Sequence, residues 1–333
     1  MVYIYKKIVG KKPYYYLRAS ERKGKRVISK DIAYLGSSIE EVKKSIENLP
    51  KFKEQIKKAY RSMHLFIESN HCLEKTESQK IKKDVFLAEK TDQIEACKLH
   101  YNSVVKKLDS TTKNEILKNF VIEFAFNTAS IEGNTINIQE ARNLLNEGLT
   151  PQNKTLREIY DLQNTEKVFF DILDEKEEIS HDLIIKIHSE LLENIDFRKD
   201  YRNADVRVLR ASFKATPAPF VRTDMDLLLK WYNENKNKLH PLVLGAVFHH
   251  KFEKIHPFFD GNGRTGRMLF NYILIKNNYP PIIIHRKTRT GYLEALKTAD
   301  KSNLIKFDKA DYLDLVEFCC DEMIEGYWNN FLV

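Results

Sequence analysis

The sequence reads His-Pro-Phe-Phe-Asp-Gly-Asn-Gly-Arg-Thr-Gly-Arg from His256 to Arg267. Apolar residues precede this stretch at spacings of four, four and three, which places them on one face of a helix: Leu244, Phe248, Phe252 and Ile255. Pro257 cannot continue that helix, and apolar residues resume at helical spacing after the glycines. The stretch therefore predicts two helices, 242–254 and 264–275, joined by a tight polar turn.

The turn has the composition of an anion site. A helix that begins directly after glycines presents its first N–H groups and the positive end of its dipole to a ligand. Gly261 and Gly263 let a phosphate approach that backbone closely. Arg264 and Arg267 lie three residues apart, so both guanidinium groups reach the same side. Two cations beside a helix N-terminus suit a polyphosphate.

Two more side chains in the turn complete a reactive set. Asp260 is placed to hold a Mg²⁺ ion shared with those phosphates. His256, at the exit of the first helix, is placed to take a proton.

Three common nucleotide motifs do not account for the stretch. Its G-x-G-x-x-G spacing lacks the preceding strand that the dinucleotide fingerprint requires. No Lys-Ser/Thr pair follows the glycines, so the pattern is not a P-loop. The kinase sequences H-R-D and D-F-G do not occur in the chain.

The stretch resembles the Fic family, whose signature HPFx(D/E)GNGRxxR it matches at all nine specified positions. The resemblance implies a mainly helical core and an enzyme that moves AMP from ATP onto a Ser, Thr or Tyr hydroxyl of a protein. It implies the following site: His256 as general base, Asp260 on Mg²⁺, Asn262 on the α-phosphate, Gly261 and Gly263 as amide cradle, Arg264 on the β-phosphate and Arg267 on the γ-phosphate. Tyr292 is either a contact to the adenine or a core tyrosine.

The resemblance reaches two segments outside the signature and covers roughly residues 109–300. Thr128 to Gly133 match the family's inhibitory pattern (S/T)xxxE(G/N), which implies that Glu132 competes with ATP for Arg267. Residues 201–221 read as extended, with Pro217 and Pro219 opposing helix, and lie where the family has a β-hairpin flap that docks the target protein.

The remaining sequence divides into three parts. Residues 1–37 predict a small basic β-meander with strands at 2–9, 13–19 and 26–35. Residues 38–108 predict a helical linker or arm. Residues 109–333 are expected to form the Fic domain, with an inhibitory helix near 113–133. Two capping boxes, Thr112-Lys-Asn-Glu115 and Thr223-Asp-Met-Asp226, predict the starts of the helices near 113–133 and at 224–236. Further helices are predicted at 154–174, 181–194, 287–300 and 309–328.

Composition sets the outer bounds. With 42% hydrophobic and 31% charged residues, the 333-residue chain has material for a folded core. The net charge of +8 and the pI near 9 permit nucleic-acid contact, above all at the basic, tyrosine-rich N-terminus. Four cysteines without metal spacing suggest reduced thiols and a cytoplasmic location. No apolar run approaches the ~18 residues of a membrane span.

Four functions stay open at this point. The leading one is protein adenylyl transfer held low by Glu132. The second is removal of AMP from a modified protein, with Glu132 aligning a water. The third uses the same cradle with another nucleotide or phosphorylated donor. The fourth is a nucleic-acid-associated regulator that acts through the N-terminal sheet. The resemblance also makes a homo-oligomer an expectation.

Overall fold

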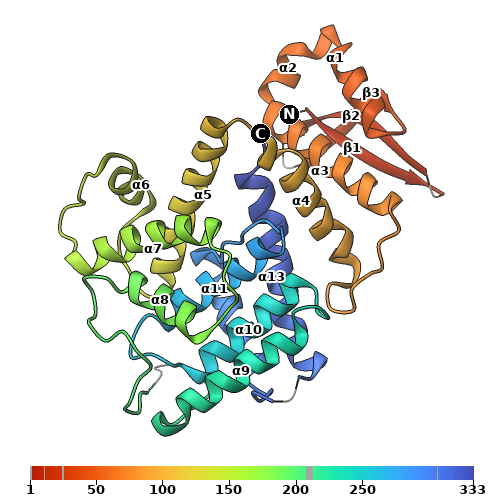
Figure 1. Cartoon of the computed structure of the whole chain (residues 1–333). Helices are drawn as coiled ribbons and strands as arrows, with labels where there is room; N and C mark the ends of the chain where they lie inside the picture. Colours follow the sequence, from red (N-terminus) through yellow and green to blue (C-terminus); the bar gives the residue numbers. More distant parts are fainter. Residues whose placement is uncertain (1, 11, 25, 208–212, 306) are drawn as a thin grey trace.

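The computed structural model describes residues 2–10, 12–24, 26–207, 213–305 and 307–333. These residues form one three-stranded sheet and thirteen α-helices (Figure 1). The sheet occupies one corner of the molecule, and α10, α11 and α13 lie near its centre. The predicted class, mainly α with a small N-terminal antiparallel sheet, is therefore confirmed.

The N-terminal sheet is an antiparallel meander in the order β1-β2-β3. Its strands are β1 (Val2–Val9), β2 (Lys12–Lys23) and β3 (Arg26–Gly36). Alternate residues such as Tyr15 and Leu17 are fully buried, because one face of the sheet packs on helices. This face shares a hydrophobic cluster with α1 (Ile39–Glu47), α2 (Lys53–Lys58) and α3 (Tyr60–Ser78).

The following helices build the main core. They are α4 (Thr91–Ser103), α5 (Ser110–Ile131), α6 (Ile138–Glu147), α7 (Leu156–Asp174), α8 (His181–Leu191), α9 (Val221–Asn235), α10 (Pro241–Ile255), α11 (Asn262–Lys276), α12 (Arg289–Ala299) and α13 (Lys309–Asn330). Short 3-10 turns lie at Pro50–Phe52, Ala88–Lys90, Val105–Lys107, Ala218–Phe220 and Arg286–Thr288. Helix α11 is buried along nearly its whole length, so its N-terminus has a fixed position.

The N-terminal hundred residues divide between two hydrophobic clusters. The buried hydrophobic residues from Val2 to Ile67 form the cluster under the sheet, whereas those from Cys72 to Val105 belong to the main core. Within the main core, His100 of α4 binds the hydroxyl of Tyr327 on α13 at 2.7 Å. The segment 38–108 thus divides between the two clusters, and the domain boundaries at 37 and 108 stay predictions.

Two predicted helix starts are wrong. Helix α5 begins at Ser110, because Asp109 accepts from the Thr112 N–H (3.0 Å) in place of the expected cap at Thr112. Helix α9 begins at Val221, directly after the 3-10 turn, and Thr223 lies inside its first turn. Helix α6 is capped by the Asn137 side chain and ends at Gly148, which has a left-handed conformation.

The predicted flap, 201–221, falls partly outside the described residues, which omit 208–212. The described residues 201–207 and 213–217 contain no strand, and a 3-10 turn follows at Ala218–Phe220. The four cysteines are buried and free. None of the described helices combines the length and apolar character needed to cross a membrane.

Candidate active site

The turn between α10 and α11 is held by its own side chains. His256 ends α10 in the left-handed conformation (φ 53°, ψ 61°). Asn262 binds both backbone groups of Phe258: its Oδ1 accepts from the N–H and its Nδ2 donates to the carbonyl, each at 2.9 Å. Phe258 is fully buried and stacks on His188 of α8 at 3.6 Å between ring centroids. Asn262 thus shapes the turn, and its contact to an α-phosphate stays a prediction.

The N-terminus of α11 faces a carboxylate from another helix. Gly261 lies in the left-handed region (φ 73°), and the first helical hydrogen bond runs from Thr265 N–H to Gly261 O (2.9 Å). Gly263 lies so close to Glu132 that an added Cβ would stand 2.0 Å from Glu132 Oε1. A side chain at 263 would therefore fill the place where an anion now meets the positive end of the helix.

Arg267 joins α11 to the end of α5. Its Nε donates to Thr128 Oγ1 at 2.6 Å, and its Nη2 donates to Glu132 Oε1 at 2.6 Å and to Thr128 O at 3.2 Å. Thr128 and Glu132 thus share one helix face, and the expected ion pair between Glu132 and Arg267 is present. Gly133 follows with φ 104° and ends the segment.

Burial and charge act in opposite directions on this pair. Arg267 is 4% exposed and the Glu132 side chain 44%. Burial raises the pKa of Glu132, but the Arg267 guanidinium outweighs it and holds this pKa below its usual value. Glu132 is therefore ionised at neutral pH and occupies Arg267 as an anion.

The other two charged residues of the signature are also paired. Arg264, 3% exposed, forms an ion pair with Asp161 of α7. Asp260 forms an ion pair with Arg157 of α7, and its Oδ1 accepts from the Gly261 N–H at 2.7 Å. Burial raises the pKa of Asp260, but Arg264 and Arg157 bring it below its usual value. A nucleotide or a metal ion that binds here would therefore share or displace these partners.

Within the described part of the chain, Asp260 does not belong to a ready-made metal-binding cluster. Among the described residues no group of three or more His, Cys, Asp or Glu side chains is arranged to hold a metal ion. One ionised carboxylate beside an anion cradle fits Mg²⁺ when phosphate oxygens and waters complete its octahedral shell. The residues present therefore suit a Mg²⁺ ion that arrives with a nucleotide.

His256 is the imidazole nearest the cradle in sequence, and its surroundings favour the neutral form. Burial lowers its pKa, so its ring is available to accept a proton at neutral pH. His249 and His250, in contrast, are buried inside α10 and bind the hydroxyls of Tyr292 (2.5 Å) and Tyr312 (3.2 Å). These two rings are therefore packed in the core and are not part of the cradle.

Tyr292 lies in the core under the arginines. Its side chain is 2% exposed and its ring stacks on His249 with 8° between the planes. This placement agrees with the core alternative of the sequence analysis. A contact with adenine stays a prediction.

Four site residues were not found from the sequence: Arg157, Asp161, His188 and Arg202. Arg157 and Asp161 lie four apart on the predicted helix 154–174, which places them on one face but names no partner. His188 donates from Nε2 to Asp260 O at 3.0 Å. Arg202 donates from Nε to His256 O at 2.7 Å. The partners in these contacts lie 54 to 103 residues apart in the sequence, so no local sequence pattern could predict them.

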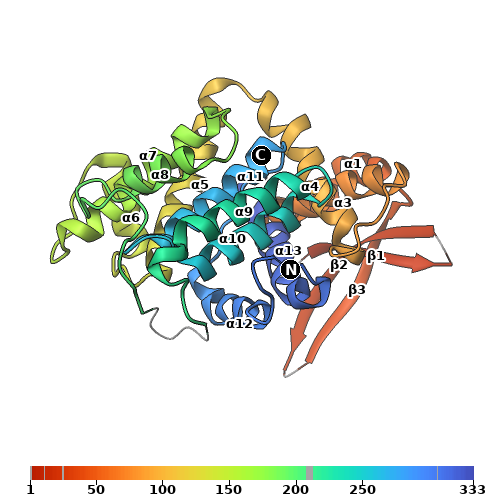
Figure 2. The ribbon, with the colours of Figure 1, turned by 60° about the horizontal axis from the view of Figure 1, so that its bottom comes forward.

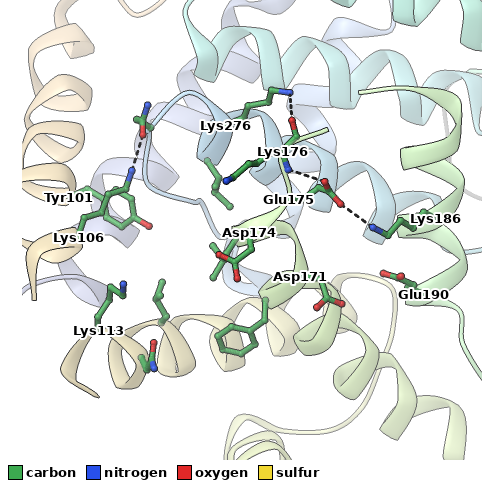
Figure 3. A pocket seen from close by; sticks show the side chains of 16 residues that line it. Tyr101, Lys106, Lys113, Asp171, Asp174, Glu175, Lys176, Lys186, Glu190 and Lys276 are labelled. Carbon is green, nitrogen blue, oxygen red and sulfur yellow. Dashed lines mark hydrogen bonds and ion pairs between the residues drawn. The ribbon is translucent and has the colours of Figure 1, made fainter. Parts of the chain in front are cut away.

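A separate hollow lies at the opposite ends of α5 and α11 (Figure 3). Its volume is about 1230 Å³, and both lysines and acidic residues line its wall. Lys186 and Glu175 form an ion pair there at 3.0 Å. Its residues from α5 and α11 are Lys113, Asn114, Leu117, Ile275 and Lys276, whereas the cradle uses Glu132 and Asn262. This hollow is not part of the candidate site.

Comparison with known proteins places the site in a family context. Residues 178–274 match the model of the Fic/DOC family. The chain is 28% identical over 204 residues to protein adenylyltransferase fic-1 of Caenorhabditis elegans, covering 60% of this chain and 40% of that protein. It is 32% identical over 200 residues to protein adenylyltransferase Fic of Drosophila grimshawi, covering 57% and 40%. The chain thus spans about 40% of the length of these curated relatives.

Two solved structures share the fold. A Fic domain containing signaling protein from Bacteroides thetaiotaomicron superposes with a TM-score of 0.64 at 25% identity, covering 70% of this chain and 94% of that one. Fic-1 from C. elegans superposes with a TM-score of 0.63 at 20% identity, covering 89% and 88%.

Proposed function

Because this chain carries a Fic domain, we propose that it transfers AMP from ATP to a Ser, Thr or Tyr hydroxyl of a target protein. We propose further that its own Glu132 holds this activity low. The observation that carries the proposal is the placement of the Glu132 carboxylate on Arg267, against Gly263 at the N-terminus of α11.

The proposed reaction assigns each group a task. The target hydroxyl attacks the α-phosphorus, a new O–P bond forms, and the bond to the leaving pyrophosphate breaks. His256 accepts the hydroxyl proton. Arg264 and Arg267 stabilise the negative charge that collects on the pyrophosphate. The N–H groups that begin α11 hold the phosphates at the position of attack.

Asp260 is the residue that would hold Mg²⁺ beside the phosphates. A bound Mg²⁺ neutralises phosphate charge and helps to orient the triphosphate. The ion pair with Arg157 keeps the Asp260 carboxylate ionised and in place until the nucleotide arrives.

Competition explains the proposed inhibition. Glu132 and a γ-phosphate are both anions that would bind the same guanidinium group of Arg267, so they compete for it. With Glu132 in place, a bound triphosphate is displaced, and a misplacement of about 1 Å is enough to cost ~10²-fold in rate. Removal of the carboxylate frees both Arg267 and the space against Gly263.

The same carboxylate supports a second candidate, removal of AMP from a modified protein. The Glu132 side chain remains 44% exposed while its Oε1 accepts from Arg267, so water reaches this side chain. Its proposed task is to orient a water, whose oxygen forms a bond to the phosphorus while the bond to the target oxygen breaks. A protonated His256 would give its proton to the leaving oxygen and would be reprotonated by the proton that the water loses.

The target segment is proposed to dock along residues 201–221. Arg202 connects this segment to His256, so a bound target would lie beside the proposed base. Backbone pairing with an extended segment would fix the register of the target without reading much of its sequence.

The test compares protein labelling by α-³²P-ATP and by γ-³²P-ATP in a lysate with added Mg²⁺. We expect the Glu132→Gly variant to transfer the α-label at least ~10²-fold faster than the unmodified protein and to transfer no γ-label. The double variant with His256→Ala should lose this gain. Transfer of the γ-label would identify a different reaction.

A matched control is available in the same chain. Glu147 ends α6 directly before the left-handed Gly148, as Glu132 precedes Gly133, but helix α6 supplies none of the site residues. Glu147→Gly should leave labelling unchanged. The contrary result has two parts. The Glu132→Gly variant is folded and binds ATP but transfers no more label than Glu147→Gly, and the unmodified protein releases AMP from an adenylylated protein. In that case the second candidate replaces the first.

A further inference from the structure

The excess positive charge of this protein is confined to its N-terminal sheet. Residues 1–36 contain ten Lys and Arg residues and two acids, Glu21 and Asp31, which gives a formal charge of +8. The whole chain, with 55 basic and 47 acidic residues, is also +8. Residues 37–333 therefore carry 45 charges of each sign and are neutral. A Lys-rich composition alone would not place the entire excess in one small element.

The sheet has one face toward the helices and one face toward solvent. Val2, Ile4, Tyr15 and Leu17 point to the helices and are buried. Strand alternation directs their neighbours to the opposite face, which carries Tyr3, Tyr5, Tyr14, Tyr16 and Arg18. Tyr34 of β3 pairs with Tyr16 and is 54% exposed. We call this solvent-facing set, with Tyr34 included, the tyrosine face.

Rings and cations alternate on the tyrosine face. Tyr34 lies 5.4 Å from Tyr16 and 6.5 Å from Tyr14 between ring centroids. The guanidinium of Arg18 stands 3.5 Å over the ring of Tyr5 and forms an ion pair with Asp31. One of the two acids of the sheet is thus already neutralised.

Further cations surround the rings on the same face. Strand alternation places Lys7, Lys12 and Arg22 there, and all three are exposed. Lys7 and Lys12 lie near the turn between β1 and β2, and Arg22 lies near the turn between β2 and β3. Figures 1 and 2 show these ends of the sheet extending away from the helices.

This combination identifies the kind of partner. Exposed rings offer a surface for stacking flat bases, and cations around them neutralise phosphates. An acidic protein segment would use the cations but not the rings. A duplex keeps its bases stacked inside and could not cover a face of rings. We propose that the tyrosine face binds a single-stranded nucleic acid, with bases on Tyr14, Tyr16 and Tyr34 and phosphates on Lys7, Lys12 and Arg22.

The proposal is independent of adenylyl transfer, because the tyrosine face uses no residue of the α10–α11 turn. It gives residues 1–36 a function that the Fic site does not supply. The chain would then combine a nucleotide-handling core with an element that localises it on nucleic acid.

The test measures fluorescence anisotropy of labelled oligonucleotides with the full-length protein. The probes are an oligouridylate and an oligothymidylate of about 15 nucleotides, and a mixed-sequence duplex of the same length. We expect either single strand to bind more tightly than the duplex. The affinity should fall at least about tenfold between 50 and 200 mM salt.

Substitutions at two exposed residues, Tyr34 and Arg22, distinguish the contribution of base stacking to binding from that of charge. Tyr34→Ser should weaken binding of the single strand by about 5- to 100-fold with little change in the salt dependence. Arg22→Gln should weaken it less and reduce the salt dependence. The controls are Tyr60→Ser, at a 63% exposed tyrosine of α3, and Lys238→Gln, at an exposed lysine after α9. Circular dichroism confirms that each variant is folded.

Three results would overturn the proposal. One is no binding of either strand at protein concentrations up to about 100 µM in low salt. Another is that polyglutamate displaces the labelled strand as well as an unlabelled strand does, and that Tyr34→Ser leaves the affinity for the strand unchanged. This pair of results would indicate an acidic protein partner. The third is tighter binding of the duplex than of the single strands.

Discussion

Arg202 holds the main-chain carbonyl of His256, with 2.7 Å between its Nε and that oxygen. The same guanidinium donates to Ala204 O (3.1 Å), Ile255 O (3.4 Å) and Thr216 O. Arg202 is 2% exposed, and its charge is balanced mainly by carbonyl dipoles, including those at the negative end of α10. Arg202 therefore connects both described parts of the 201–221 segment, 201–207 and 213–221, to His256, the residue proposed as the base.

Arg202→Lys should slow transfer far more than it weakens ATP binding. Lysine keeps the charge but cannot form the fork that reaches four carbonyls, so His256 loses its fixed position. We expect a fall of about 10²-fold in kcat in the Glu132→Gly background, with the KM for ATP within about threefold. Arg142→Lys, at an exposed arginine paired with Glu123, is the matched control. A parallel loss in ATP affinity would show that Arg202 supports the whole site rather than His256.

His256→Ala should abolish transfer and leave nucleotide binding intact. The imidazole acts on the hydroxyl proton and not on the phosphates, so its loss costs about 10²–10⁴ in rate. Labelling kinetics in the Glu132→Gly background measure the rate, and calorimetry measures ATP binding. His250→Ala is an unsuitable control because that ring is buried on Tyr312 and Asp300, whereas His64→Ala changes a half-buried ring on α3, outside the candidate site. Labelling at an unchanged rate would exclude His256 as the base.

Arg264→Ala should weaken the binding of ATP more than that of AMP. The proposed partner of Arg264 is the β-phosphate, which AMP lacks. The variant also leaves Asp161 buried without its cation, and removal of one partner of a buried pair costs about 3–5 kcal/mol. Arg264→Ala with Asp161→Asn is therefore the variant to measure, because it avoids the stranded charge. Equal losses for the two nucleotides would contradict the placement of Arg264 on the β-phosphate.

Asp260→Ala should remove the Mg²⁺ dependence of ATP binding and leave AMP binding nearly unchanged. The carboxylate is the only acidic side chain of the signature, and it is ionised at neutral pH. Titration of ATP with and without Mg²⁺ measures the difference. An unchanged Mg²⁺ effect in this variant would assign the ion to another residue.

Glu253 should make the protein less stable as the pH rises. Burial, reinforced by the nearby Glu132, raises its pKa to about 8, and its Oε1 lacks a hydrogen-bond partner among the described residues. The folded chain therefore binds this proton between about pH 4.5 and 8, where the unfolded chain has released it. The free energy of unfolding should fall over that range by up to about 1.4 kcal/mol per pH unit.

The Glu253→Gln variant tests this directly, because glutamine keeps the shape and does not titrate. Urea unfolding at several pH values should show a flatter dependence for Glu253→Gln than for the unmodified protein. The exposed Glu234→Gln is the control and should follow the unmodified protein. Identical slopes for all three proteins would show that Glu253 is ionised in the folded state at neutral pH.

Local features of the sequence determined the two helices of the site and the turn between them. The apolar spacing before His256 and after Arg264 allowed only helix, and Pro257 and the glycines broke it at one place. The observed helices α10 and α11 extend the predicted ones by one or two residues at each end. Thr128 and Glu132 could be placed on one face for the same reason, since a spacing of four fixes their direction on any helix.

The partners of these side chains were decided by the packing of distant helices. Asp161 reaches Arg264 and Arg157 reaches Asp260 because α7 lies against α11, across 103 residues of sequence. Arg202 reaches His256 because its segment returns to the end of α10. Periodicity gives the face of a helix but not the neighbour that this face meets. The sequence by itself therefore determined where the charged groups stand, and only the tertiary structure decided which of them are already paired before a ligand binds.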